Sequence, residues 1–295
     1  MPADAASVRP ARRPVLRALL AAGQAVAGLA LLVLLFRLLG ADAARNALSV
    51  LTPGTVAAAV AAGLVATAAQ AQRWRLVARG RGLRIAFGDA VAECWAAGLV
   101  NLLLPAGLAG DAVRVLRRRG RGDSWPGAGA SVAGERLAGT SVLLTVATVP
   151  ALAVGGWLAV VLGAAALAAG AVAWWSMGAA PVRDRAAVWA LSVLAWGCYQ
   201  ALFLLAALRA APEAPPVDLW GTTVLGLAGM SIPVGVGGWG PREGITALAA
   251  MAHGLPAEVG FAISLAYGLL AFASALPGAL VLMRWLRPVR PAGSH

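Results

Sequence analysis

The feature that most constrains this sequence is a series of apolar segments, each about as long as a bilayer-crossing helix. A helix needs about 20 apolar residues to cross the hydrocarbon core. Six segments of this kind occur along the chain, at residues 15–39, 53–72, 128–150, 156–179, 185–209 and 257–283. Charged residues make up only 12% of the 295 residues, whereas a soluble domain is about one quarter charged. We therefore predict an all-α polytopic membrane protein.

The arginines predict how the chain is oriented. All 24 basic residues are arginine, against 12 acidic residues, and the net charge is +12. Nineteen of the arginines fall in the N-terminal region, the C-terminal tail and three polar links, and arginine is typical of cytoplasmic loops. We expect a disordered cytoplasmic tail at 1–14, a single transmembrane domain at 15–286 and a cytoplasmic tail at 287–295, in a bacterial-type cell (inner) membrane. This topology explains the basic charge without nucleic-acid binding.

Two further apolar stretches, at residues 88–112 and 219–252, are interrupted by proline and glycine. Arginine-rich loops flank the first stretch on both sides, so it should enter and leave the membrane on the cytoplasmic side. The arginine-rich segments can all lie on the cytoplasmic side only if the second stretch enters the membrane from the opposite side. The expected fold therefore has six full spans and two oppositely oriented re-entrant hairpins, and such broken helices mark binding sites in inverted-repeat transporters. Two ordinary turns between helices, giving up to eight crossings, are the alternative.

Both interruptions end at a predicted helix start. Asp111 after Gly110 suits an N-cap, and Pro241 after Gly240 suits the first helical position. Helix N-termini carry unpaired N–H groups and a partial positive charge. Each predicted helix start lies close in sequence to an arginine, Arg114 or Arg242. The helix start and the arginine together predict an anion site that would bind a phosphate group.

Several charged residues lie within or beside the apolar segments, where an isolated charge is costly. Asp111 and Arg114 are three residues apart and can pair on one helix face. The adjacent residues Glu135 and Arg136 point in different directions, as do Arg242 and Glu243. We therefore expect cross-pairing between the hairpin regions: Glu135 or Asp111 with Arg242, and Glu243 with Arg136 or Arg114. A purely structural role for these pairs is the alternative.

The chain resembles the flippase-like membrane domain of the lysylphosphatidylglycerol synthase family, as a stand-alone member. The resembling residues are Arg73-Trp74-Arg75, Phe87 with Asp89, Asn101 with Leu104-Pro105, Gly110-Asp111 with Arg114, Ser131-Val132 with Glu135-Arg136-Leu137, and Gly237-Gly238-Trp239-Gly240 with Arg242-Glu243. The resemblance implies a polytopic helical domain that is linked to lipid movement between leaflets. It does not imply aminoacyl transfer, which belongs to a separate soluble domain of the bifunctional members.

The main hypothesis is a lipid translocase for an anionic phospholipid or a polyprenyl-phosphate-linked lipid, with possible proton or cation coupling. The alternatives are a membrane enzyme that modifies lipid headgroups, with Asp111 or Glu243 as general base, and an accessory subunit of a lipid or glycan synthase. We expect no catalytic set, metal or cofactor. The predicted substrate-binding residues are Asn101, Pro105, Gly110, Asp111, Arg114, Glu135, Arg136, Gly238, Gly240, Arg242 and Glu243.

Overall fold

The computed structural model describes residues 26, 29–30, 33–34, 36–37, 42–104, 108–232 and 238–286. The described residues before position 50 are helical, and the helices with known bounds follow them. Their bounds are α2 (Pro53–Gly80), α3 (Phe87–Leu103), α4 (Ala109–Gly120), α5 (Trp125–Val154), α6 (Gly156–Ser176), α7 (Val182–Ala210), α8 (Pro216–Gly229), α9 (Pro241–Ala252), α10 (Ala257–Ala275) and α11 (Pro277–Leu286). The predicted tails at 1–14 and 287–295, Pro105 and much of the span at 15–39 lie outside the described residues.

Five of the described helices are long and apolar enough to cross a membrane: α2, α5, α6, α7 and α10. The first four coincide with expected spans. The prediction of a helical multi-pass membrane protein is therefore confirmed in its main feature. The helix α2 lies inside the bundle and packs against α3, α5, α7 and α10. Small residues allow these close contacts, since a Cβ on Gly63 would lie only 2.8 Å from the carbonyl oxygen of Ser274 in α10.

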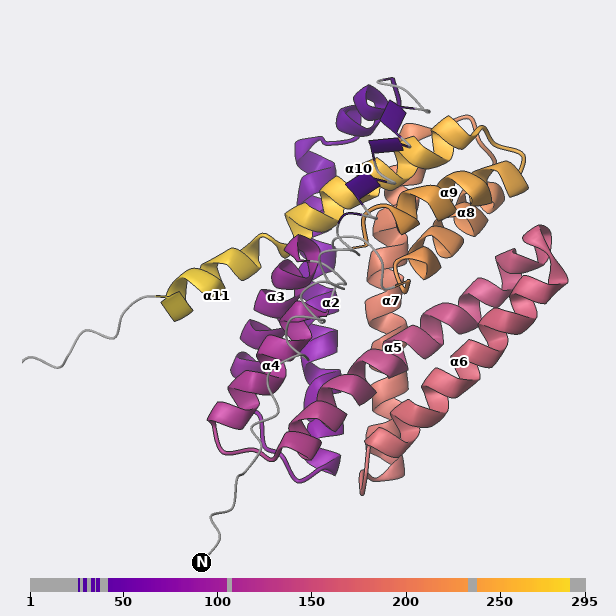
Figure 1. Ribbon diagram of the computed structural model, residues 1–295. Coiled ribbons are helices and arrows are strands. Elements are labelled where there is room, and N and C mark those ends of the chain that lie inside the picture. Colours follow the sequence, from indigo (N-terminus) through magenta and orange to yellow (C-terminus); the bar gives the residue numbers. More distant parts are fainter. Residues whose placement is uncertain are drawn as a thin grey trace, which may run out of the picture.

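The last membrane-spanning helix is shorter than the span expected at 257–283. The chain breaks between α10, which ends at Ala275, and α11, which begins at Pro277. Proline lacks the N–H that would continue the helix, and its ring clashes with the carbonyl group four residues earlier. Beyond the break, α11 projects from the side of the bundle and packs against α3 (Figure 1).

Two pairs of short helices correspond to the two interrupted stretches. Helices α3 and α4 pack against each other beside α2, and α8 and α9 form a second pair toward the opposite end of the bundle (Figure 1). These helices have 17, 12, 14 and 12 residues. At 1.5 Å per residue, all four are shorter than the ~30 Å hydrocarbon core. The first pair extends beyond the predicted boundary at residue 112, because the arginine-rich run to Gly120 is helical rather than a loop.

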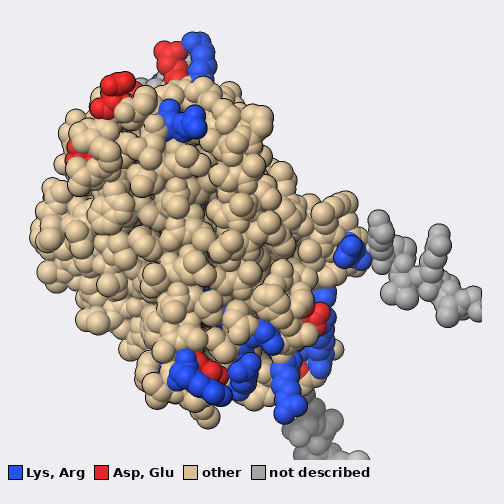
Figure 2. Space-filling view, turned by 180° about the vertical axis from the view of Figure 1, so that it is seen from behind, with Lys and Arg blue, Asp and Glu red and all other residues tan. Residues whose placement is uncertain are grey.

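Charge is concentrated at one end of the molecule. Figure 2 shows most of the blue arginine surface at the end where α2 terminates and α5 begins, and a wide uncharged surface beyond it. The opposite end carries a few charges of both signs, among them Asp42 and Arg45, which form an exposed pair with 2.8 Å between Oδ1 and Nη1. This distribution is typical of a membrane protein with one arginine-rich face.

A glycine fixes the distance between α3 and α4. A Cβ on Gly110 would overlap the carbonyl oxygen of Ala97 and lie 2.6 Å from its Cα. We expect Gly110→Ala to lower the free energy of unfolding by about 1–3 kcal/mol, because the backbone of Ala97 cannot rotate away as a side chain could. Thermal denaturation in detergent checks this, with Gly120→Ala as the control because a Cβ there meets nothing within 4 Å. Equal stability of the two variants would contradict the prediction.

Candidate functional site

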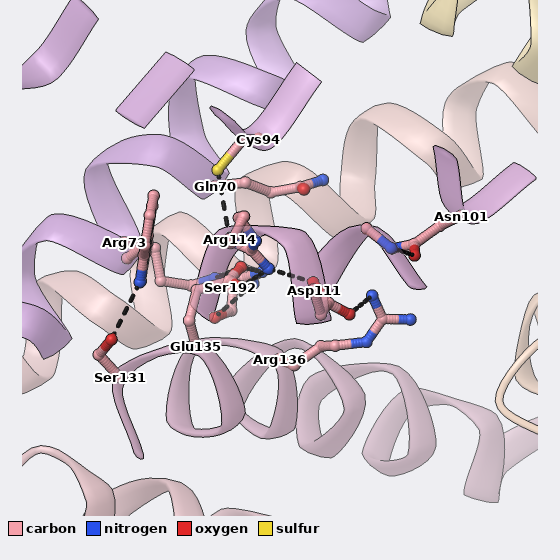
Figure 3. Close-up of polar contacts among 12 residues, drawn as sticks. Gln70, Arg73, Cys94, Asn101, Asp111, Arg114, Ser131, Glu135, Arg136 and Ser192 are labelled. Carbon is pink, nitrogen blue, oxygen red and sulfur yellow. Dashed lines mark hydrogen bonds and ion pairs between the residues drawn. The ribbon is translucent and has the colours of Figure 1, made fainter. Parts of the chain in front are cut away.

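Five charged side chains from three helices form what we call the first cluster, which consists of Arg73, Asp111, Arg114, Glu135 and Arg136 (Figure 3). Glu135 of α5 lies at its centre. Its Oε1 accepts hydrogen bonds from Nε of Arg73 at 3.0 Å and from Nη2 of the same residue. Its Oε2 accepts a hydrogen bond from Nη2 of Arg114 at 3.2 Å. One carboxylate therefore joins α2, α4 and α5.

Asp111 adds two ion pairs to the first cluster. One carboxylate oxygen pairs with Nη2 of Arg114 and the other with Nη1 of Arg136. The predicted Asp111–Arg114 pair is thus confirmed. The side chain of Arg136 is 43% exposed, whereas those of Asp111 and Arg114 are 11% and 6% exposed. Arg136 is therefore the member of the cluster that a molecule outside the bundle can reach.

The first cluster contains three arginines and two carboxylates, so its formal charge is +1. Arg73 also donates from Nη1 to Oγ of Ser192 in α7 at 3.0 Å. The guanidinium of Arg114 lies 4.9 Å from the ring centre of Trp74, whose indole N–H is held by Ser131. Even so, Nε of Arg114 is buried and has no hydrogen-bond partner among the described residues. The cluster is therefore cationic and has unused hydrogen-bonding capacity.

The beginning of α4 differs from the prediction. The N-cap position is Leu108, and Asp111 lies in the first turn, where its carboxylate pairs with arginines instead of capping the helix. Asn101 of α3 takes over part of the capping, because its Oδ1 accepts a hydrogen bond from the N–H of Gly110 at 2.7 Å. The expected N-cap role of Asp111 is therefore wrong, while Asn101 and Gly110 do meet at the helix start. Pro105 is not among the described residues.

A second cluster surrounds the beginning of α9 and consists of Trp239, Arg242, Glu243, Ser264 and Tyr267. The side chains of Arg242 and Glu243 are completely buried and paired with each other. Nε of Arg242 donates to Oε1 of Glu243 at 2.9 Å and to Oγ of Ser264 at 3.0 Å. The aromatic rings of Trp239 and Tyr267 lie 4.5 and 5.3 Å from the guanidinium carbon.

The start of α9 has the predicted geometry. Pro241 occupies the first helical position, and Gly240 precedes it with a φ of 97°. Gly238 also has a positive φ, 84°, so both turns favour glycine. Oε2 of Glu243 accepts the N–H of Gly240 at 2.6 Å. The carboxylate of Glu243 therefore already supplies the negative charge that we predicted a ligand would bring to this helix start.

The predicted cross-pairing between the hairpin regions is wrong. Within the described residues, Arg242 and Glu243 pair with each other, and Asp111, Arg114, Glu135 and Arg136 pair within the first cluster. Adjacent Cβ atoms do point in different directions, but the long arginine side chain folds back over its neighbour. The two regions are connected through α5, which packs against α4, α8 and α9.

Sequence reasoning missed Arg73 as a site residue, because the arginines after residue 72 were assigned to a loop. The helix α2 continues to Gly80, and Arg73 lies in its buried face beside Trp74. The apolar residues Leu76 and Val77, which follow the arginine, are the signal that could have indicated a longer helix. Among the described residues, no group of three or more His, Cys, Asp or Glu side chains could hold a metal ion.

The fold and the buried charges define a polytopic helical membrane protein with two short helix pairs and two charged clusters inside its apolar region. The family model of the lysylphosphatidylglycerol synthase TM region matches residues 16–186, more than half of the chain. The protein belongs to this family. The match includes the first cluster and ends before the second. Comparisons with curated proteins and with solved structures give no match.

Proposed function

We propose that this protein moves an anionic lipid, either a phospholipid or a polyprenyl-phosphate-linked lipid, between the two leaflets. Family membership supports a function connected with membrane lipids. The observation that carries the proposal is the first cluster: a net positive group of side chains inside an apolar protein, with one arginine accessible from outside. Charged residues at membrane depth are costly and usually mark a substrate pathway.

In this proposal the two helix pairs are re-entrant hairpins that enter the bilayer from opposite sides. Their lengths support this, because each helix is too short to cross the core alone. The arginine-rich end then lies in the cytoplasm, together with both termini, in a cell membrane. The first hairpin would bring the first cluster to the region where a headgroup must leave water.

Arg136 would make the first contact with the lipid phosphate. Asp111 is one of its partners, and Asp111 also pairs with Arg114. A phosphate that replaces Asp111 at Arg136 leaves Asp111 paired with Arg114, so no buried charge is left alone. Nε of Arg114 has no hydrogen-bond partner in the described part of the chain, so a second phosphate oxygen could bind it. Arginine–phosphate hydrogen bonds are among the strongest in proteins.

The second cluster would have a different role in this proposal. Arg242 and Glu243 neutralise each other and are completely buried, so we assign them mainly to holding the start of α9. One buried nitrogen of Arg242, Nη1, has no hydrogen-bond partner within the residues that the structure describes. Because this nitrogen is buried, a lipid headgroup that passes between the hairpins could contact it only after the second hairpin moves.

A translocation assay with purified protein in liposomes tests the proposal. We expect the wild type to move a fluorescent anionic phospholipid between leaflets, and Arg136→Ala to be slower by at least about tenfold, as loss of one strong charged contact implies. Arg209→Ala is the control, because Arg209 is exposed at the end of α7. Both variants should keep the wild-type melting temperature.

Two outcomes would contradict the proposal. Equal rates for wild type, Arg136→Ala and protein-free liposomes would exclude translocation of the probe lipid by this site. Conversion of the probe into a chemically altered lipid, detected by mass spectrometry, would favour the headgroup-modifying enzyme instead.

A further inference from the structure

A cavity of about 380 Å³ lies at the arginine-rich end of the molecule, outside both clusters. Its lining consists of Arg75, Arg79, Leu83, Arg84 and Ile85. Three of these five residues are arginines and none is acidic. The residues come from the last turns of α2 and from the turn that leads into α3. We call this cavity the basic pocket.

The basic pocket has a well-ordered wall. The turn after α2 is closed by hydrogen bonds from the N–H of Gly82 to the oxygen of Arg79 at 2.9 Å and from Leu83 to Ala78 at 2.9 Å. Gly82 has a φ of 77°, which favours glycine. The side chains of Leu83 and Ile85 are buried in a core with Trp74. Arg84 stands between these two buried residues and is exposed.

Neutral groups hold Arg75 in place, and no carboxylate of the described residues pairs with it. Its Nε donates to the carbonyl oxygen of Ile85 at 2.8 Å, and its Nη1 donates to Oε1 of Gln72 at 2.7 Å. The guanidinium also lies 5.6 Å from the ring centre of Phe87. All these partners are neutral, so the positive charge of Arg75 is oriented but not compensated.

The pocket contains more positive charge than its surroundings neutralise. Asp184 of α7 approaches Arg79, with 3.5 Å between Oδ2 and Nη1, and it also approaches Arg183 at 3.7 Å. Arg84 forms no ion pair with a carboxylate in the part of the chain that the structure describes. Three guanidinium groups around one cavity repel one another unless an anion lies between them.

The basic pocket is separate from the first cluster. Arg75 follows Arg73 by two residues in the same helix, so the two side chains point about 200° apart. Arg73 faces Glu135 inside the bundle, while Arg75 faces the turn that leads into α3. The same end of the molecule carries further arginine–aromatic contacts, including Arg81 over Trp175 at 5.0 Å and Arg185 over Trp174 at 4.4 Å. Such amphipathic pairs are typical of the level of lipid headgroups.

We propose that the basic pocket is a binding site for a phosphate group, held by Arg75, Arg79 and Arg84, and that its ligand is the headgroup of an anionic phospholipid resident in the arginine-rich leaflet. The arginine–aromatic contacts at the same end of the molecule suit the headgroup of a lipid better than a free ion. This inference depends on the protein lying in a membrane but not on translocation, since the pocket shares no residue with the first cluster.

Binding of defined probes to the full-length protein in detergent tests the site. The probes are short-chain phosphatidylglycerol, short-chain phosphatidylcholine and inorganic phosphate, and the measurement is the dissociation constant from native mass spectrometry or thermal shift. We expect phosphatidylglycerol to bind preferentially, and Arg84→Gln and Arg79→Gln each to weaken its binding by about tenfold. Arg119→Gln, which removes an exposed arginine at the same end outside the pocket, should leave binding unchanged.

The outcomes separate the possible sources of the phosphate. Equally tight binding of inorganic phosphate, also weakened by Arg84→Gln, would support the site but assign it to a free anion instead of a lipid. Unchanged phosphatidylglycerol binding in both pocket variants would overturn the proposal. Equal weakening by Arg119→Gln would also overturn it, because the general positive charge of the surface would then explain the binding. Loss of translocation in Arg136→Ala with unchanged phosphatidylglycerol binding would confirm that the two sites act separately.

Discussion

Replacement of Glu243 by leucine is expected to lower the free energy of unfolding by about 3–5 kcal/mol. The substitution removes the charged partner of Arg242, whose side chain is completely buried, and Ser264 alone remains to accept a hydrogen bond from it. It also leaves the N–H of Gly240 without its acceptor. Reversible unfolding in bicelles gives the free energy, and thermal denaturation in detergent gives the order of the variants.

Two further variants separate this mechanism from a general effect of the substitution. Glu213→Leu changes an exposed glutamate in the same way and should have little effect. The double variant Arg242→Met with Glu243→Leu removes both charges and should recover much of the lost stability, because apolar residues can replace a buried ion pair. A single Glu243→Leu variant as stable as the wild type would show that Arg242 does not depend on this carboxylate.

The second large effect is expected for Glu135→Leu, again about 3–5 kcal/mol of lost stability. Glu135 is the shared partner of Arg73 and Arg114. Among the described residues, its removal leaves Arg73 with a hydrogen bond to Ser192, and leaves Arg114 with Asp111 as its remaining carboxylate and a 3.5 Å contact to Sγ of Cys94. Because Glu135 connects α4 to α5 and α2, we also expect faster hydrogen exchange in α4. Mass spectrometry of peptides from Ala109–Gly120 measures this exchange.

The matched control for Glu135 is Glu258→Leu, which changes an exposed glutamate in the first turn of α10. Hydrogen exchange in α4 of the Glu258→Leu variant should equal that of the wild type. The double variant Arg73→Met with Glu135→Leu should be more stable than Glu135→Leu alone, since Arg114 keeps Asp111 as partner. Unchanged exchange in α4 after loss of Glu135 would mean that the helix pair is held by apolar packing and not by the first cluster.

Local features of the site were predictable from the sequence. The Asp111–Arg114 pair follows from a spacing of three residues in a helix, and the start of α9 follows from the geometry of Pro241. Both depend on residues within one turn of each other. The N-cap role expected for Asp111 failed because its carboxylate meets two arginines, one of which, Arg136, comes from another helix.

The partners of the buried charges could not be predicted in the same way. Glu135 lies 62 residues from Arg73 in the chain, and only the packing of α2 against α5 brings them together. The prediction of ion pairs between the two hairpin regions was wrong for a related reason. Arg242 pairs with the adjacent residue Glu243, so its charge is neutralised without a carboxylate from a distant part of the chain.

The sequence by itself determined that this chain is a helical membrane protein, where its main apolar helices lie and which end carries the arginines. These properties are sums over neighbouring residues, because the transfer of each side chain into lipid contributes nearly independently of the rest. The tertiary structure alone decided that Arg136 remains accessible while Arg242 is enclosed. Accessibility and ion pairing depend on which helix faces meet, and that choice results from packing over the whole bundle at once.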